Sequence, residues 1–315
     1  SRICASGVPA LQIPEIVRAR ALLRGDEGRR WLGELPALTA SLAHDWDLET
    51  GGVLAGGTDA LVVSCRTRDR QDVVLKIMMP GLASGNDQVR ALLAFGGRGY
   101  VTVLRHDLDR NAILMEKLGP QLSDLGLPVA AQIEAICATL RETWLANPDG
   151  SGFMTGAEKA DSLATFIAGL WRDFAGVCSQ RTVDLAYDFA ELRRRAFDPA
   201  ICVLAHGDAH AANTLADPGD PTRFKFIDPD GLFIERAYDL AIPIREWGDE
   251  LLAGDPLELG RRRCERLARL TGVEPEPIWQ WGFIERVSTG LLLHQLGQES
   301  LAKEFLTVAD AWAVA

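Results

Sequence analysis

The chain has 315 residues, of which 47% are hydrophobic and 24% charged, and its formal net charge is -11. A chain of this length and composition can bury a large core in one domain or two. The negative net charge argues against nucleic acids and anionic membranes as partners, since both need a positive face on the protein. It permits a small cationic partner, and it is equally typical of proteins that are acidic only for the sake of solubility.

Cysteine usage and hydropathy bear on the compartment. The cysteines are scattered, form no C-x-x-C pair and lie mostly in apolar runs, as reduced, buried thiols of a cytoplasmic protein do. The first 16 residues hold no continuous apolar stretch, and no run approaches the roughly 18 residues of a membrane helix. We expect a soluble cytoplasmic protein, a monomer or a small homo-oligomer.

The N-terminal part is predicted to be helical up to about residue 45, with apolar residues at helical spacing over 13–23, 28–32 and 36–42. The period then changes. A strand from residue 47 leads into two glycine pairs at 51–52 and 56–57, and β-rich runs follow at 60–65 and 72–78 around a polar turn. This order predicts a strand, a glycine loop and a hairpin.

Lys76 lies in the apolar part of the second of these runs. A charged side chain on an apolar strand needs a partner, and a strand lysine behind a glycine loop is where a kinase contacts the α- and β-phosphates of its nucleotide. The backbone N–H groups of Gly56 and Gly57 would approach the same phosphates. A plain turn and a lysine snorkelling from an edge strand are the alternatives.

The rest of the chain divides at about residue 118. A helix over 86–95 and strands over 100–104 and 112–118, joined by a polar turn at 106–111, complete a five-stranded α+β domain over 1–118 that includes the helical extension 1–45. Gly119 and Pro120 follow as a hinge. The domain over 119–315 is mainly helical, with helices expected at 129–145, 163–177, 183–197, 235–247, 257–270, 278–296 and 300–312.

Two polar turns after short apolar runs mark the candidate site. The first holds Asp208 and Asn213, and the second holds Asp228. The spacing of Asp208 and Asn213 equals that of the kinase loop H-R-D-x-x-x-x-N, in which the aspartate orients the acceptor hydroxyl and takes its proton. The amide of Asn213 and the carboxylate of Asp228 are hard oxygen ligands suited to Mg²⁺. The pattern therefore indicates phosphoryl transfer.

Two histidines, His206 and His210, flank Asp208 and would also fit a zinc hydrolase. The kinase interpretation accounts for Asn213 and Asp228 as well, so we favour it. In that case the histidines hold the loop by hydrogen bonds to the backbone or to Asp239, which itself has a structural role.

The motifs H-G-D-A-H-A-A-N at 206–213, I-D-P-D-G at 227–231 and Y-D-L-A at 238–241 resemble those of the aminoglycoside phosphotransferase family. N-terminal segments, including V-L-K-I-M-M-P at 74–80, resemble the streptomycin 6-kinase and hydroxyurea-kinase branch. The resemblance implies a protein-kinase-like fold of two lobes and ATP-dependent phosphorylation of a small-molecule hydroxyl with Mg²⁺.

The resemblance also assigns residues. Asp208 corresponds to the catalytic base, Asn213 and Asp228 to the metal ligands and Lys76 to the phosphate-binding lysine. The backbone over Glu116, Lys117 and Leu118 corresponds to the hinge that faces adenine. The helix glutamate that pairs with the lysine in kinases is missing between Lys76 and Tyr100, and Asp87 is the candidate substitute.

The implied substrate is an aminoglycoside, streptomycin at its 6-hydroxyl, with antibiotic resistance as the outcome. A guanidinylated substrate needs carboxylates, and Asp230 and Glu235 are the candidates that follow the site. Two other functions fit the same motifs: a kinase for another metabolite, such as hydroxyurea, homoserine or an amino sugar, and a nucleotide-binding pseudokinase without transfer.

Overall fold

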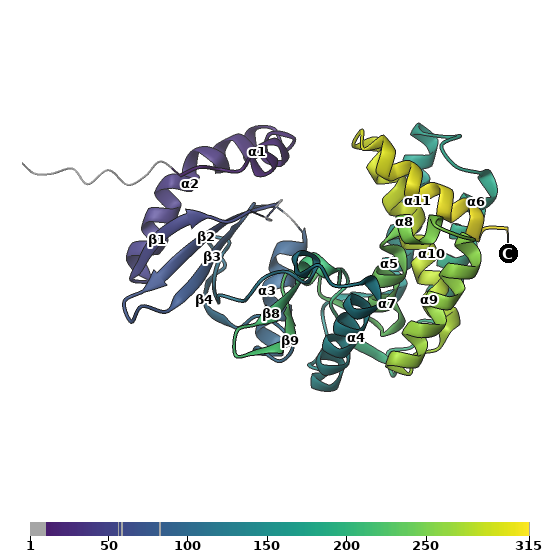
Figure 1. Ribbon diagram of the computed structural model, residues 1–315. Coiled ribbons are helices and arrows are strands. Elements are labelled where there is room, and N and C mark those ends of the chain that lie inside the picture. Colours follow the sequence, from purple (N-terminus) through teal and green to yellow (C-terminus); the bar gives the residue numbers. More distant parts are fainter. Residues whose placement is uncertain (1–10, 56, 58, 82, 315) are drawn as a thin grey trace, which may run out of the picture. The chain divides into compact units, whose positions relative to one another are not determined.

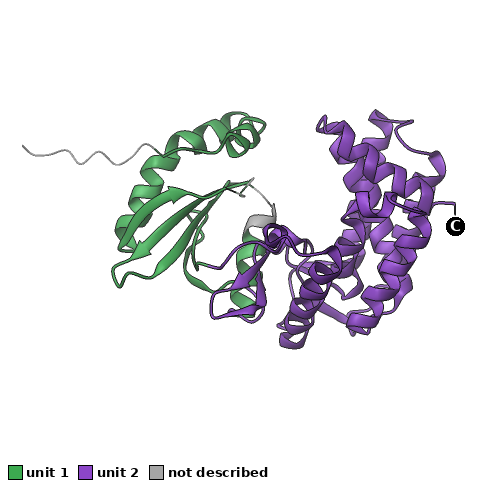
Figure 2. Cartoon of the chain, viewed as in Figure 1, with its two compact units in different colours: residues 1–96, 101–117 green, residues 97–100, 118–315 purple. Residues whose placement is uncertain are grey.

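The computed structural model describes residues 11–55, 57, 59–81 and 83–314 (Figure 1). The chain forms two compact units, one of residues 1–96 and 101–117 and the other of residues 97–100 and 118–315 (Figure 2). Within the described residues no helix is both long and apolar enough to cross a membrane. The cysteines in this part of the chain are buried free thiols.

The first unit is built on an antiparallel sheet, five-stranded over the described residues, in the order β1-β2-β3-β5-β4. The strands are β1 (Leu48–Val53), β2 (Ala60–Thr67), β3 (Asp72–Met78), β4 (Val103–Asp107) and β5 (Ala112–Glu116). Lys76 pairs with Val62 of β2 and Ile113 of β5, so it lies on a central strand and not on an edge.

Two local predictions for this unit were wrong. Gly51 and Gly52 belong to β1 and not to a loop; a Cβ on Gly51 would lie 2.9 Å from the carbonyl oxygen of Ser64, so glycine allows a close approach of β1 to β2. His106, expected in a turn, lies in β4. Gly57 lies between β1 and β2, whereas Gly56 is outside the described residues.

Helices α1 (Glu15–Leu22) and α2 (Asp26–Asp45) pack on the sheet through one apolar core that joins Leu35 and Leu42 to Leu75 and Ile77. The predicted stretches 28–32 and 36–42 form the single helix α2, because Pro36 lies inside the helix and does not interrupt it. Leu75 and Ile77 alternate with Lys76 along β3. The side chain of Lys76 therefore points to the other face of the sheet. Helix α3 (Ala83–Phe95) supplies the partner of Lys76 described below.

The second unit is a helical body arranged around one central helix, α10 (Pro275–Gln295). This helix is buried around most of its circumference and packs against α5, α6, α7, α9 and α11 (Figure 1). The other helices are α4 (Val129–Ala146), α5 (Gly156–Asp173), α6 (Gln180–Arg195), α7 (Ala237–Arg245), α8 (Gly248–Leu252), α9 (Pro256–Thr271) and α11 (Glu299–Trp312), with short 3-10 turns η1 (Leu122–Leu125) and η2 (Ala211–Asn213).

Local signals explain where several of these helices begin and end. Asp255 caps α9 by accepting from the N–H groups of Leu257 and Glu258, and Gly272 ends it at φ +73°. Thr155 opens α5 in a capping box with Glu158.

Short strands in this unit carry the polar turns. β7 (Cys202–Ala205) pairs antiparallel with β10 (Leu232–Glu235), which pairs in parallel with β6 (Met154–Thr155). β8 (Thr214–Asp217) and β9 (Asp220–Phe226) form a hairpin. Because Ala205 at the end of β7 is opposite Leu232 at the start of β10, the segments 206–208 and 228–231 emerge from the same end of the sheet.

Candidate active site

Backbone hydrogen bonds join the two polar turns of the second unit. The N–H of Ile227 donates to the carbonyl of Asn213 at 3.0 Å, and the N–H of Asp230 donates to the carbonyl of His206 at 2.7 Å. Segments 206–213 and 227–230 are thus held together by hydrogen bonds, as expected for groups that must keep a fixed mutual geometry.

His206 is fully buried and joins the two turns through its ring nitrogens. Its Nδ1 accepts from the N–H of Asp208 at 3.1 Å, and its Nε2 donates to the carbonyl of Ile227 at 2.9 Å. The ring also stacks on Tyr100 and meets the ring of Phe226 edge-on. Burial lowers the pKa of His206 to about 4, so the ring is neutral at pH 7. Both ring nitrogens are engaged, which leaves no nitrogen for a zinc ion.

Asp239, at the start of α7, is fully buried beneath the same loop. Its two oxygens accept from the N–H of Gly207 at 2.9 Å and from Nε1 of Trp144 at 2.8 Å. Burial raises the pKa of Asp239 to about 6 in spite of these donors. Asp239 therefore anchors the loop through the backbone of Gly207.

The Asp208 side chain, 37% exposed, has a basic side chain next to each carboxylate oxygen. Oδ1 lies 3.2 Å from Nη2 of Arg245, and Oδ2 lies 3.4 Å from Nε2 of His210. Burial on its own would raise the pKa of Asp208, but the contact with His210 and the charge of Arg245 outweigh it and hold the pKa well below its usual value. Burial on its own would lower the pKa of His210, but the contact with Asp208 and the charge of Glu246 outweigh it and raise that pKa.

Asn213 and Asp228 fit a magnesium ion by donor type. The side-chain amide of Asn213 donates to the carbonyl of Asp208 at 3.0 Å, so its Oδ1 is the atom left for a cation. Asp228 stands in the left-handed region at φ +57°, which non-glycine residues adopt mainly where the surroundings impose it. No cluster of three or more His, Cys, Asp or Glu side chains able to hold a metal occurs among the described residues. One carboxylate and one amide oxygen are a sufficient protein share for Mg²⁺, which keeps several waters.

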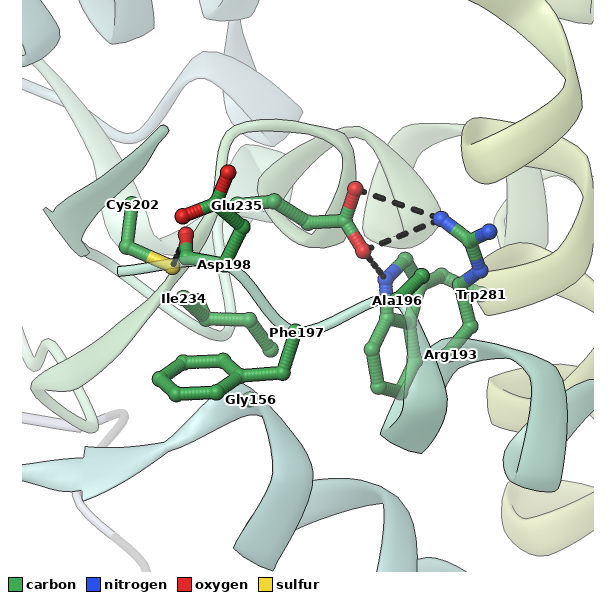
Figure 3. Close-up of a pocket in the computed structure, with 9 residues that line it drawn as sticks. All are labelled: Gly156, Arg193, Ala196, Phe197, Asp198, Cys202, Ile234, Glu235 and Trp281. Carbon is green, nitrogen blue, oxygen red and sulfur yellow. Dashed lines mark hydrogen bonds and ion pairs between the residues drawn. The ribbon is translucent and has the colours of Figure 1, made fainter. Parts of the chain in front are cut away.

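Asp230 and Glu235, the candidate substrate contacts, have different surroundings. Asp230 lies over Gly207, and burial raises its pKa to about 6 in spite of the nearby charge of Lys159. Glu235 accepts from Arg193 at 3.1 Å and from the indole of Trp281 at 2.9 Å, and these side chains line a small cavity (Figure 3). The carboxylate of Glu235 already has a cationic partner, so Asp230 is the better candidate for a substrate cation.

In the first unit, Nζ of Lys76 donates to Oε1 of Gln88 on α3 at 2.8 Å. The suggested partner Asp87 instead pairs with Arg90 at 2.7 Å. An amide therefore occupies the place where kinases have a glutamate. At the end of β5, the carboxylate of Glu116 accepts from the N–H of Thr102 at 2.7 Å, while Lys117 is exposed.

Sequence reasoning missed two cationic residues, Arg245 in contact with Asp208 and Lys159, whose charge acts on Asp230. Arg245 is a charged residue that ends the apolar run after Asp239 in α7, a pattern that indicates a buried partner. Lys159 on α5 lies over the ring of Tyr238, 5.5 Å from its centroid, and no pattern in the sequence singled it out.

A hydrogen-bonded pair of turns that presents an aspartate, an asparagine and a second aspartate, in a chain that also has a small unit built on an antiparallel sheet, is typical of a kinase-type phosphotransferase. Residues 45–297 match the family described as aminoglycoside/hydroxyurea antibiotic resistance kinase, and the chain belongs to that family. The resemblance in the sequence motifs is thus confirmed, and the protein is a phosphotransferase.

Curated relatives cover nearly the whole chain. Streptomycin 6-kinase from Streptomyces glaucescens is 26% identical over 96% of this chain and 97% of its own length. Hydroxyurea phosphotransferase from Kitasatospora aureofaciens is 29% identical over 95% of this chain and 85% of its own length.

Solved structures confirm the predicted kinase-like fold. A choline kinase from Streptococcus pneumoniae matches with a TM-score of 0.61 at 12% identity, covering 90% of this chain and 100% of its own. An aminoglycoside phosphotransferase from Streptomyces rimosus, solved with ADP and streptomycin, matches with a TM-score of 0.53 at 16% identity, covering 81% of this chain and 98% of its own.

Proposed function

We propose that this protein transfers the γ-phosphoryl group of ATP to a hydroxyl of an aminoglycoside, with the 6-hydroxyl of streptomycin as the leading acceptor and antibiotic resistance as the outcome in the cytoplasm. The observation that carries the proposal is the hydrogen-bonded pair of turns that presents Asp208, Asn213 and Asp228 together. The relatedness to streptomycin 6-kinases supports the choice of acceptor.

In the proposed reaction, Asp208 takes the proton of the acceptor hydroxyl. The acceptor oxygen forms its bond to the γ-phosphorus, and the bond from that phosphorus to the bridging oxygen of ADP breaks. Oδ1 of Asn213 and the carboxylate of Asp228 would hold Mg²⁺, which neutralises phosphate charge when bound.

The first unit supplies the nucleotide contacts in this proposal. Lys76 would contact the phosphates together with backbone N–H groups near Gly57, and the backbone over 116–118 would face the adenine. Gln88 orients the ammonium group of Lys76 as the helix glutamate does in protein kinases.

Asp230 is the proposed contact for a cationic group of the acceptor. The backbone of Asp230 is held beside the loop of Asp208, because its N–H donates to the carbonyl of His206 and its Cβ packs on Gly207. A planar guanidinium binds a carboxylate through two parallel hydrogen bonds, which suits streptomycin and offers nothing to a neutral acceptor.

The test is ADP release measured against a panel of streptomycin, hydroxyurea, homoserine and an amino sugar, with the position of the product's phosphate read by NMR. We expect streptomycin to stimulate ADP release most. Stimulation by another acceptor alone would overturn the proposed substrate, and nucleotide binding without any transfer would identify a pseudokinase.

Asp208→Asn tests the base. The variant should lose about 10²- to 10⁴-fold in kcat, the usual contribution of a general base, while binding ATP as well as the wild type does. Asp161→Asn, a change of an exposed carboxylate on α5, is the matched control and should be fully active. Equal activity in Asp208→Asn would exclude Asp208 as the base.

Hydroxyurea is the second candidate acceptor, since the family description and one relative carry its name. Asp230→Asn separates the two acceptors. It should lower kcat/KM for the cationic streptomycin by about tenfold, the worth of one charge-assisted contact, and leave the neutral hydroxyurea unaffected. An equal loss for both would show that Asp230 supports the loop and does not bind the acceptor.

A further inference from the structure

The side chain of Arg245 reaches Asp208 from the last turn of α7. It is 11% exposed, and its Nη2 lies 3.2 Å from Oδ1 of Asp208. Its other nitrogens are also engaged: Nη1 contacts Glu285 at 2.9 Å and Nε contacts Glu246 at 3.0 Å. A guanidinium with donors in a rigid planar fork keeps one orientation when each edge has its own acceptor.

The backbone beneath Arg245 is equally constrained. Arg286 donates to the carbonyl of Arg245, and Arg263 donates to the carbonyl of Ile244 at 3.4 Å and to that of Glu246. Arg286 is fully buried between the rings of Phe305 and Trp312 of α11. Two buried cations thus cap the carbonyl end of α7, where the helix dipole favours positive charge.

Glu285 connects this helix end to the core. It also accepts from the hydroxyl of Tyr238, so a buried chain of contacts runs from Tyr238 through Glu285 and Arg245 to Asp208. Tyr238, Glu285 and Arg245 come from α7 and α10, which pack closely against each other. Asp208 itself stands on a loop, and a loop residue gains precision when rigid helices hold its side chain.

We propose that Arg245 is a positioning residue for phosphoryl transfer: it holds the Asp208 carboxylate in the orientation that receives the acceptor proton and offsets negative charge where an anionic nucleotide must react. This inference rests on the proposed role of Asp208. Arg245 does not touch the acceptor in this scheme and acts through Asp208.

A purely structural role, in which Arg245 only neutralises Glu285, makes different predictions. Glu285→Gln removes that ion pair and leaves the contact between Arg245 and Asp208 in place. If Arg245 is structural, Glu285→Gln should be as harmful as Arg245→Ala. If Arg245 positions the base, Arg245→Ala should be much the slower enzyme.

The experiment measures kcat and KM for Arg245→Ala, Arg245→Lys and Glu285→Gln with the acceptor that the wild type prefers. We expect Arg245→Ala to lose about 10²-fold in kcat, as misplacement of a reacting group by about 1 Å does, with KM for ATP within about threefold of wild type. Added guanidinium ion should restore part of that kcat. Arg266→Lys, which changes an arginine paired with Glu134 between α9 and α4, is the matched control and should retain full activity.

Arg245→Lys keeps the positive charge without the planar fork, so it tests orientation if Arg245→Ala does not fold. We expect a loss of about tenfold in kcat at an unchanged melting temperature. Wild-type kcat in Arg245→Lys, or a loss seen only in KM for ATP, would overturn the inference.

A double-mutant cycle separates this inference from the proposed function. If Arg245 acts through Asp208, Asp208→Asn combined with Arg245→Lys should be no slower than Asp208→Asn alone. Additive losses would overturn the role of Arg245 while leaving Asp208 as the base. A fully active Asp208→Asn would refute the proposed base instead.

Discussion

Gly207→Ala probes how tightly the loop before Asp208 is packed. Gly207 has φ +87°, and a Cβ built on it would lie 2.9 Å from Cβ of Asp230 and 3.0 Å from Cδ1 of Leu232. A non-glycine residue at positive φ costs about 1 to 2 kcal/mol. Asp230 cannot give way easily, because its N–H is bonded to the carbonyl of His206, so overpacking adds about 1 to 3 kcal/mol.

The expected loss is therefore about 2 to 5 kcal/mol in the free energy of unfolding. Gly272→Ala is the control: this glycine has φ +73° with no atom within 4 Å of a built Cβ, so it should show the backbone cost alone. Urea unfolding followed by tryptophan fluorescence measures both variants, since most of the tryptophans lie in the second unit. Gly207→Ala should also lower kcat, because Asp208 is the next residue. Equal stability and equal activity of the two variants would refute the packing argument.

Three further predictions concern the buried histidine, the lysine contact and the metal. The pKa of His206 is lowered to about 4, so the stability that its neutral ring contributes is present above the ordinary pKa of 6.5 and is lost as the pH falls toward 4. The free energy of unfolding of wild type should exceed that of His206→Gln by about 2 kcal/mol less at pH 5 than at pH 7. A difference in urea unfolding that stays constant with pH would contradict a buried neutral ring. Gln88→Glu should keep KM for ATP within about threefold of wild type, because a carboxylate can replace the amide at the ammonium of Lys76. Lys76→Ala should raise KM for ATP at least about tenfold. Similar KM values for both variants would refute the contact between Lys76 and ATP. Chelation by EDTA should abolish phosphoryl transfer, and added Mg²⁺ should restore it. Asp228→Asn should need about tenfold more Mg²⁺ than wild type for half-maximal velocity. An unchanged Mg²⁺ concentration for half-maximal velocity would exclude Asp228 as a ligand.

The helical and β-rich segments could be predicted because their signals are local. The strands at 60–65 and 72–78 and most of the long helices of the second unit were found within a few residues of their observed bounds, since apolar periodicity follows from which face an element buries. The exception is α5, which was predicted over 163–177 and begins at Gly156. The errors have local causes as well. Gly51 was interpreted as a loop residue, but it lies in β1 where that strand closely approaches β2, and a single sequence does not reveal this approach.

The partner of Lys76 illustrates how small such an error can be. Asp87 was the candidate and Gln88 makes the contact. One step along a helix turns a side chain by about 100°, and the phase of α3 against β3 depends on how Val89 and Phe95 pack. A prediction from the sequence could place the partner on this helix but could not choose between neighbours.

The sequence by itself determined the family, the kinase-like fold and the group of residues proposed for catalysis, because Asp208, Asn213 and Asp228 stand in short motifs whose spacing reflects local backbone geometry. Only the tertiary structure decided what surrounds them. Arg245 meets Asp208, and Trp144 meets Asp239, across long stretches of chain. Such contacts arise from the packing of α4 and α7 in the helical body, and packing depends on the whole core.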